Sequence, residues 1–103
     1  MATRNYAGLA VEVNEEGFLT NAAQWSKDVA LAIAKEEGLA LTPKHLEVID
    51  YLRARSQNGE TLTLRSVGNS GIVDTKAFYE LFPGAPLKRA ARIAGIPKPA
   101  SCV

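Results

Sequence analysis

The sequence has very little cysteine and histidine, with one residue of each among 103. A single cysteine cannot form a disulfide within the chain, which argues against a disulfide-stabilised secreted scaffold and favours a reducing cytoplasm. The chain also shows no cluster of metal-ligating residues, no glycine-rich phosphate loop and no paired acids. We therefore expect a cytoplasmic protein with no metal and no other cofactor.

Long apolar runs are absent as well. No stretch approaches the roughly 18 apolar residues of a membrane-spanning helix, and the N-terminal "MATRNYAGLAVEVNEEG" lacks the apolar core of a signal peptide. Apolar residues make up 47% and charged residues 22% of the chain, which are ordinary globular values. We expect one folded domain over residues 1–95, followed by a separate C-terminal segment over 96–103.

Acidic residues are missing from the last part of the chain. After Glu80 come Lys88, Arg89, Arg92 and Lys98, with no Asp or Glu among them. The whole chain carries a net charge of only +1, so the two signs are unevenly distributed. Such a basic stretch is either an ordinary solvated face or a surface for an acidic partner.

The N-terminal part predicts a β-hairpin. Apolar residues alternate along 9–13, the sequence NEEG at 14–17 supplies turn residues, and Phe18 and Leu19 return on the far side. Helical patterns follow over residues 26–38, 42–59, 74–84 and 85–95. Thr42 is the expected N-cap of the second of these helices, with Pro43 in its first position and Asn58-Gly59 as its stop signal. Asp74 is the expected N-cap of the third. Residues 60–73 fit either a short helical turn or a loop.

The chain ends in "IPKPASCV", with its cysteine next to last. Pro97 and Pro99 disfavour helix, so this segment is expected to be an extended, flexible arm that carries Cys102 up to roughly 20 Å from the domain. His45, at the start of its predicted helix and far along the chain from the cysteine, is expected to be a surface or first-turn residue. A thiol without a base of its own suits a carrier that a partner protein activates.

The segment LFPGAPLKRAARIAGIPKPASCV resembles the C-terminus of the family that contains the gamma subunit of dissimilatory sulfite reductase (DsrC) and the sulfur-relay protein of tRNA thiolation (TusE). The segment GFLTNAAQWSKDVALAIAKEEGLALTPKHLEVIDYLR resembles the family's N-terminal half. The resemblance implies a mostly α fold with a small N-terminal β-hairpin (α+β), in which a helical bundle contains a helix-turn-helix-like unit. It also implies that Cys102 accepts and donates sulfur as a persulfide.

Two departures from the family pattern stand out. Proteins that work with sulfite reductase have a second cysteine eleven positions before the last one, and this chain has Ala91 there. The stretch RSVGNSGIVDTK is shorter and richer in glycine than its counterpart in those proteins. Both departures favour the single-cysteine branch, to which the tRNA-thiolation protein belongs.

These observations together favour a sulfurtransferase in the sense of a persulfide-carrying relay protein without a self-contained active site. The implied partners are a sulfur-relay donor complex and an acceptor sulfurtransferase or tRNA-thiolating enzyme of 2-thiouridine synthesis. Lys88, Arg89, Arg92 and Lys98 would contact these partners. The identities of donor and acceptor, and the oligomeric state, stay open.

Two alternatives also stay open. One is an accessory protein of sulfite-reductase-type sulfur metabolism, which neighbouring genes would distinguish from a tRNA-thiolation protein. The other is a nucleic-acid-binding or regulatory protein in which Arg53, Arg55 and Arg65 of the helix-turn-helix-like unit contact phosphates. The near-neutral net charge disfavours this second alternative, because phosphate binding usually rests on more basic residues.

Overall fold

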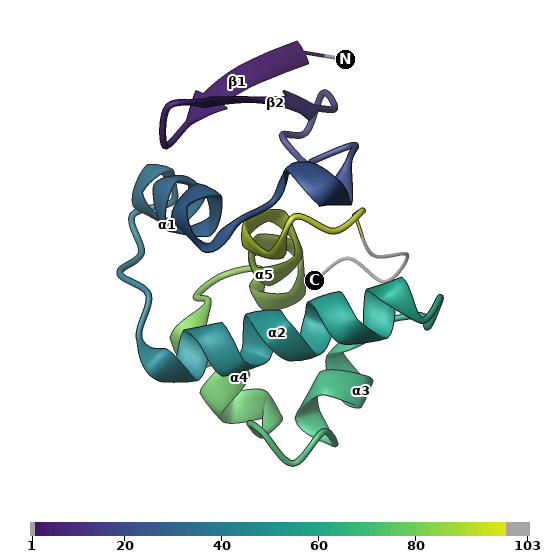
Figure 1. The fold of residues 1–103 in the computed structure, drawn as a ribbon. Helices are drawn as coiled ribbons and strands as arrows, with labels where there is room; N and C mark the ends of the chain where they lie inside the picture. Colours follow the sequence, from purple (N-terminus) through teal and green to yellow (C-terminus); the bar gives the residue numbers. More distant parts are fainter. Residues whose placement is uncertain (1, 99–103) are drawn as a thin grey trace.

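A computed structural model describes residues 2–98 of the chain (Figure 1). Within these residues the elements are β1 (Ala2–Tyr6), β2 (Leu9–Val13), the 3₁₀ helix η1 (Ala22–Gln24), α1 (Lys27–Glu36), α2 (Pro43–Gln57), α3 (Leu64–Gly68), α4 (Thr75–Leu81) and α5 (Pro86–Ala94). The expected mostly α fold with an N-terminal hairpin is confirmed. The extended, flexible arm predicted over residues 96–103 stays a prediction, because residues 99–103 lie outside the described part.

The turn of the β-hairpin lies at residues 7–8, earlier in the chain than the turn that the sequence predicts at 14–17. β1 and β2 pair antiparallel, and the turn between them is Ala7–Gly8, both with positive φ, as short hairpin turns require. The predicted strand over 9–13 is confirmed, but the prediction that residues 18–19 form its partner strand is wrong. Leu19 makes only an isolated bridge to Val13. Alanine rarely adopts positive φ, so the residue types at 7–8 are a weak signal for this turn.

The longest helix, α2, begins and ends where its sequence predicts. The Thr42 side chain accepts a hydrogen bond from the backbone N–H of His45, and Pro43 occupies the first position. Asn58 and Gly59 follow its last turn, and Gly59 has a φ of 75°. The expected N-cap and stop signal are confirmed.

His45 lies in the first turn of α2, one of its two expected positions, and it is buried there rather than at the surface, with only 7% of the residue exposed. The Thr42 N–H lies 3.0 Å from Nδ1, which therefore accepts, and Nε2 donates to the Leu81 carbonyl at 2.8 Å. The imidazole ring meets Phe82 edge-on. His45 thus joins the start of α2 to the end of α4.

Residues 60–73 contain the short helix α3, which Thr63 caps at its N-terminus. Asp74 caps α4, also as predicted, and α3 packs against α4. The two short helices lie below α2 (Figure 1), and α2 and α3 carry Arg53, Arg55 and Arg65 of the expected helix-turn-helix-like unit. No helix among residues 2–98 has both the length and the apolar character needed to cross a bilayer.

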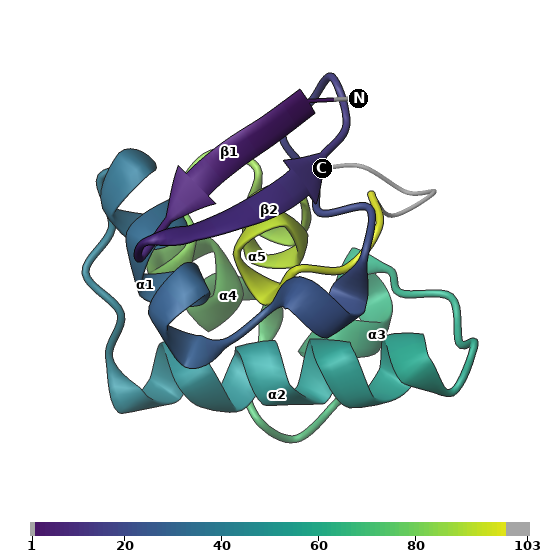
Figure 2. The same cartoon turned by 45° about the horizontal axis from the view of Figure 1, so that its top comes forward.

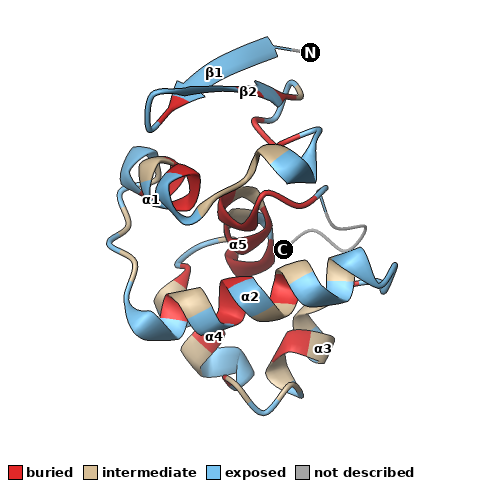
Figure 3. Ribbon diagram, viewed as in Figure 1, coloured by how far each residue is buried: buried red, intermediate tan, exposed pale blue. Residues whose placement is uncertain are grey.

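The helix α5 lies at the centre of the molecule. It packs against α1, α2 and α4, with the hairpin beyond α1 (Figure 2). Most of its surface is buried (Figure 3), and three of its buried residues are Ala90, Ala91 and Ala94. Small side chains at these positions let the neighbouring helices approach closely. The segment that leads to Cys102 therefore starts from the most buried helix of the fold.

Candidate functional site

Cys102 itself lies outside the described residues, so the structure describes the surface from which its segment leaves. That surface is formed by Gly95, residues 96–98 and the side chains that contact them. Gly95 ends α5 in the left-handed conformation, with a φ of 68°. A Cβ atom at this position would clash with the Trp25 ring, lying only 2.9 Å from its Cγ. Only glycine meets both requirements without strain.

Two side chains from other elements cap the C-terminus of α5, and we call Trp25 and Arg53 the α5 cap. Trp25 Nε1 donates to the Ile93 carbonyl at 2.8 Å, and Arg53 Nη1 donates to the Ala94 carbonyl at 2.7 Å. The Arg53 guanidinium lies 4.1 Å from the centroid of the Trp25 ring. Helix carbonyls that lack a partner within the helix are thereby satisfied. Burial lowers the pKa of Arg53, an effect that Asp50 partly opposes.

The next residues are also held to the domain. The Ile96 N–H donates to the Ala91 carbonyl at 3.2 Å, and the Ile96 side chain is buried. Lys98 Nζ lies 2.8 Å from Oε2 of Glu16, which is also 4.0 Å from Lys88 Nζ. The hydrogen bond from Lys98 lowers the pKa of Glu16, against the smaller opposing effect of desolvation. The proposed boundary between residues 95 and 96 stays a prediction.

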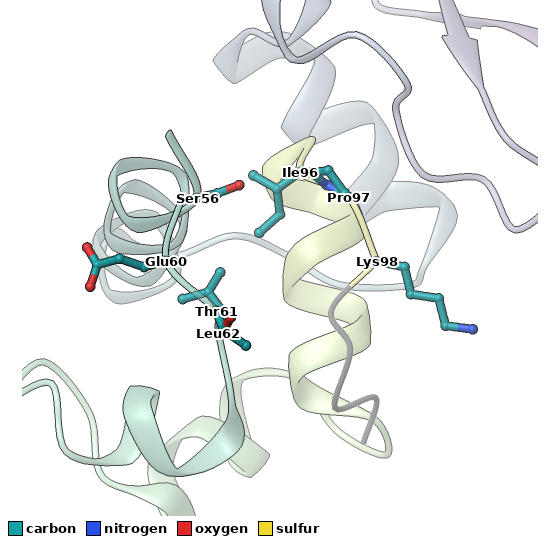
Figure 4. A pocket seen from close by; sticks show the side chains of 7 residues that line it. All are labelled: Ser56, Glu60, Thr61, Leu62, Ile96, Pro97 and Lys98. Atoms are coloured by element: carbon teal, nitrogen blue, oxygen red, sulfur yellow. The ribbon is translucent and has the colours of Figure 1, made fainter. Parts of the chain in front are cut away.

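A groove of about 190 Å³ lies beside this segment. Ile96, Pro97 and Lys98 line one side, and the last turn of α2 with the connection after it lines the other. The Lys98 side chain extends away from the second wall (Figure 4). The residues of the second wall are Ser56, Glu60, Thr61 and Leu62. The lining mixes hydroxyl, carboxylate and aliphatic groups. Among residues 2–98, no group of three or more His, Cys, Asp or Glu side chains could hold a metal ion.

The four basic residues predicted as partner contacts lie close together, and we call Lys88, Arg89, Arg92 and Lys98 the basic face. Lys88 and Lys98 share Glu16, whereas Arg89 and Arg92 share Glu37. A second groove, of about 350 Å³, lies between these charges and Ala85. Neither glutamate is predicted as a site residue from the sequence. The sequence feature that could have indicated them is the excess of acidic residues in the N-terminal half, where the sequence EEG occurs twice.

Arg92 differs from the other three basic residues because only 12% of its side chain is exposed. It forms ion pairs with Glu36 and Glu37 at the end of α1, and its Nη2 donates to the Tyr6 hydroxyl at 3.4 Å. Burial lowers the pKa of Arg92, but the hydrogen bonds to the two glutamates outweigh this effect and the net shift is upward. Arg92 therefore joins α5 to α1 and β1.

Two arginines of the nucleic-acid alternative are engaged within the protein. Arg53 belongs to the α5 cap, and Arg55 Nη1 lies 3.0 Å from a Glu60 carboxylate oxygen and over the ring of Tyr51. A carboxylate beside Arg55 opposes phosphate binding at that position. These internal roles of Arg53 and Arg55 compete with the phosphate contacts that the alternative requires of them.

The sequence model of the family described as "DsrC like protein" matches residues 5–103. A sulfurtransferase TusE from Escherichia coli O6:H1 is 34% identical over 106 residues, covering 95% of this chain and 97% of the relative. The NMR structure of Allochromatium vinosum DsrC matches with a TM-score of 0.84 and 34% identity, over 98% of this chain and 97% of that one.

A third match is the crystal structure of the oxidised gamma subunit of the dissimilatory sulfite reductase (DsrC) from Archaeoglobus fulgidus. Its TM-score is 0.83 at 32% identity, over 99% of this chain and 100% of that one. Sequence and fold thus agree with family members over nearly their whole length. The resemblance that the C-terminal motif indicated is confirmed, and the chain belongs to the DsrC-like family.

Proposed function

We propose that this protein is a sulfur-relay sulfurtransferase that carries persulfide sulfur on Cys102. The observation that carries the proposal is that the chain, which has one cysteine, matches relatives named sulfurtransferase over almost their full length. Persulfide formation is a reversible modification of a cysteine thiol. A single thiol close to the end of the chain is suited to receiving sulfur from one protein and passing it to another.

The transfer needs no oxidant or reductant. The Cys102 thiolate attacks the outer sulfur of a donor persulfide, R–S–SH. The donor's S–S bond breaks, a new S–S bond forms on Cys102, and the electron pair leaves with the donor thiolate. The proton lost from the Cys102 thiol balances the one that the donor thiolate takes up. The second transfer, from Cys102 to an acceptor thiolate, is the same reaction with the roles exchanged.

The absence of a second cysteine limits which sulfur chemistry one chain can perform. Ala91, the position that resembles the family's second-cysteine site, is buried on α5. The chain cannot form an internal disulfide, so any disulfide of Cys102 is intermolecular. We therefore favour a relay role in tRNA thiolation, in the cytoplasm, over a two-thiol cycle with a sulfite reductase.

We propose that the exposed members of the basic face, Lys88, Arg89 and Lys98, contact the sulfur donor and acceptor. Their charges attract an acidic partner surface and raise its association rate. Arg92 contributes indirectly, by fixing α5 against α1. This division of roles gives the exposed and buried basic residues different expected phenotypes.

The function is tested by incubating the protein with a cysteine desulfurase, L-cysteine and its relay proteins, and measuring the intact mass. The native protein gains one sulfur atom, which a reducing agent removes, and Cys102→Ser gains none. A matched control moves the thiol by one position, with Ser101→Cys added to Cys102→Ser. Sulfur gained by Cys102→Ser, or an unmodified native protein beside persulfidated donors, contradicts the proposal.

A further inference from the structure

The segment that leads to Cys102 is held at three successive places after α5. The α5 cap binds the carbonyls of Ile93 and Ala94, and Trp25 contacts Gly95 so closely that a Cβ there would clash. Ile96 is buried, with its N–H bonded back to α5. These contacts fix both the direction in which the chain leaves α5 and the position of the next residue.

The third contact is the ion pair of Lys98 with Glu16. Glu16 belongs to the turn over 14–17, which Asn14 stabilises by accepting the N–H groups of Glu16 and Phe18. Arg92 Nε also donates to the Gly17 carbonyl at 3.4 Å, which joins the turn to α5. The partner of Lys98 is therefore itself a well-supported residue.

We infer that the reach of Cys102 is counted from Lys98 rather than from the end of α5, and that its protein partners dock on the face formed by Lys88, Lys98 and Glu16. Cys102 lies four residues beyond Lys98, which an extended, polyproline-like chain spans in about 12 Å. Counted from Gly95, the span is seven residues, or about 20 Å. The shorter reach confines the partner's reacting sulfur to the neighbourhood of Lys98.

The charges on this face specify an acidic protein surface as the partner. One carboxylate, that of Glu16, serves both Lys98 and Lys88, and all three side chains are substantially exposed. Lys88 Nζ lies 4.0 Å from Glu16, farther than Lys98 Nζ at 2.8 Å, so partner carboxylates can bind Lys88 at low cost while Lys98 keeps its contact with Glu16. The choice of partner rests on the proposed function, whereas the anchoring of residues 96–98 is independent of it.

The anchoring is tested without any partner, because the single cysteine accepts a nitroxide spin label at one site only. In the full-length protein, line broadening of backbone amides is expected to be strongest near Glu16, Thr61 and Lys88. It is expected to be weakest in residues 39–42, in the connection between α1 and α2, which lies across the molecule from the end of α5 (Figures 1 and 2). Equal broadening at both ends would overturn the anchoring.

The role of the α5 cap is tested with the same label. Arg53→Gln and the milder Trp25→Phe, which keeps an aromatic ring but loses the N–H, should spread the broadening toward residues 39–42. Arg55→Gln, on the same helix as Arg53, should leave the pattern unchanged. An unchanged pattern in both cap variants would show that Trp25 and Arg53 do not position the segment.

The docking face is tested by sulfur transfer from a persulfidated relay protein. Lys88→Glu should slow transfer about tenfold, whereas the charge-matched Lys76→Glu on α4 should not, and both should keep the native rate of Cys102 alkylation by iodoacetamide. Equal transfer rates in the two variants would overturn the docking face. A native protein that receives no sulfur contradicts the proposed function instead, and the spin-label result then stands alone.

Discussion

Gly95 shows how a single residue fixes the start of the segment that leads to Cys102. Its positive φ and the adjacent Trp25 ring make separate demands. Gly59 has a similar φ of 75°, but a Cβ at that position would meet no atom of residues 2–98 within 4 Å beyond its own chain neighbours. Comparing alanine variants of the two glycines therefore separates the free-energy cost of a positive φ from the free-energy cost of the clash with Trp25.

We predict that Gly95→Ala lowers the free energy of unfolding by about 3 kcal/mol, and Gly59→Ala by about 1 kcal/mol. Both values are measured by urea denaturation followed by circular dichroism. Equal losses in the two variants would mean that Trp25 moves away from residue 95 without cost, and that the contact does not constrain the segment.

Single residues are predictable from the sequence where their partners are close in the chain. Thr42 and Asp74 cap helices that begin immediately after them, and the sequence identifies both. The sequence does not reveal the internal contacts of His45 and Arg92, because the Leu81 carbonyl and Glu36 and Glu37 are far away along the chain. A charged or polar residue is recognised as internal only once the fold supplies its partners.

At the scale of elements, α5 both packs in the core and presents basic side chains, and its sequence alone does not show which basic residues are buried. Its inner side packs in the core, while its charged residues form most of the basic face. The α-helical boundaries are predictable because proline, glycine and capping residues mark them locally. The hairpin is not, because its register depends on a turn of Ala7 and Gly8, whose positive φ values the residue types barely signal.

The different environments along α5 lead to a prediction about two of its basic residues. Arg92→Met removes the partner of two glutamates and should lower the free energy of unfolding by about 2 kcal/mol. Lys88→Met should change it by less than about 0.5 kcal/mol, because its ion pair is exposed. Thermal and urea denaturation measure both effects. Similar losses in the two variants would refute the internal role assigned to Arg92.

At the scale of the whole molecule, the acidic N-terminal half and the basic C-terminal half fold onto each other. Glu16, Glu36 and Glu37 contact basic residues that follow Glu80 in the chain. The basic face is thus partly neutralised by the protein's own carboxylates. The uneven charge distribution in the sequence reflects internal pairing as well as any surface for a partner.

This pairing predicts how stability depends on pH. The hydrogen bond from Arg92 lowers the pKa of Glu36 below its ordinary value of 4.5, although desolvation opposes the shift. The unfolded state therefore binds this proton more readily, so the stabilisation is complete above pH 4.5 and is lost as the pH falls through the lower, folded-state pKa.

Glu36→Gln should consequently flatten the acid limb of the stability curve, measured by urea denaturation at a series of pH values at low salt. Glu15→Gln removes the same charge from an exposed position and should leave the curve parallel to that of the native protein. Matching curves for the two variants would show that the Arg92–Glu36 pair does not contribute to the pH dependence.

Whether Cys102 carries sulfur from one protein to another is decided by a pulse and chase followed by intact-mass spectrometry. The protein is first persulfidated, separated from the donor, and then mixed with an acceptor sulfurtransferase. We predict that the extra sulfur leaves Cys102 and that the acceptor gains it. Sulfur that stays on Cys102 through the chase, or that appears only as free sulfide, would contradict the proposed relay function.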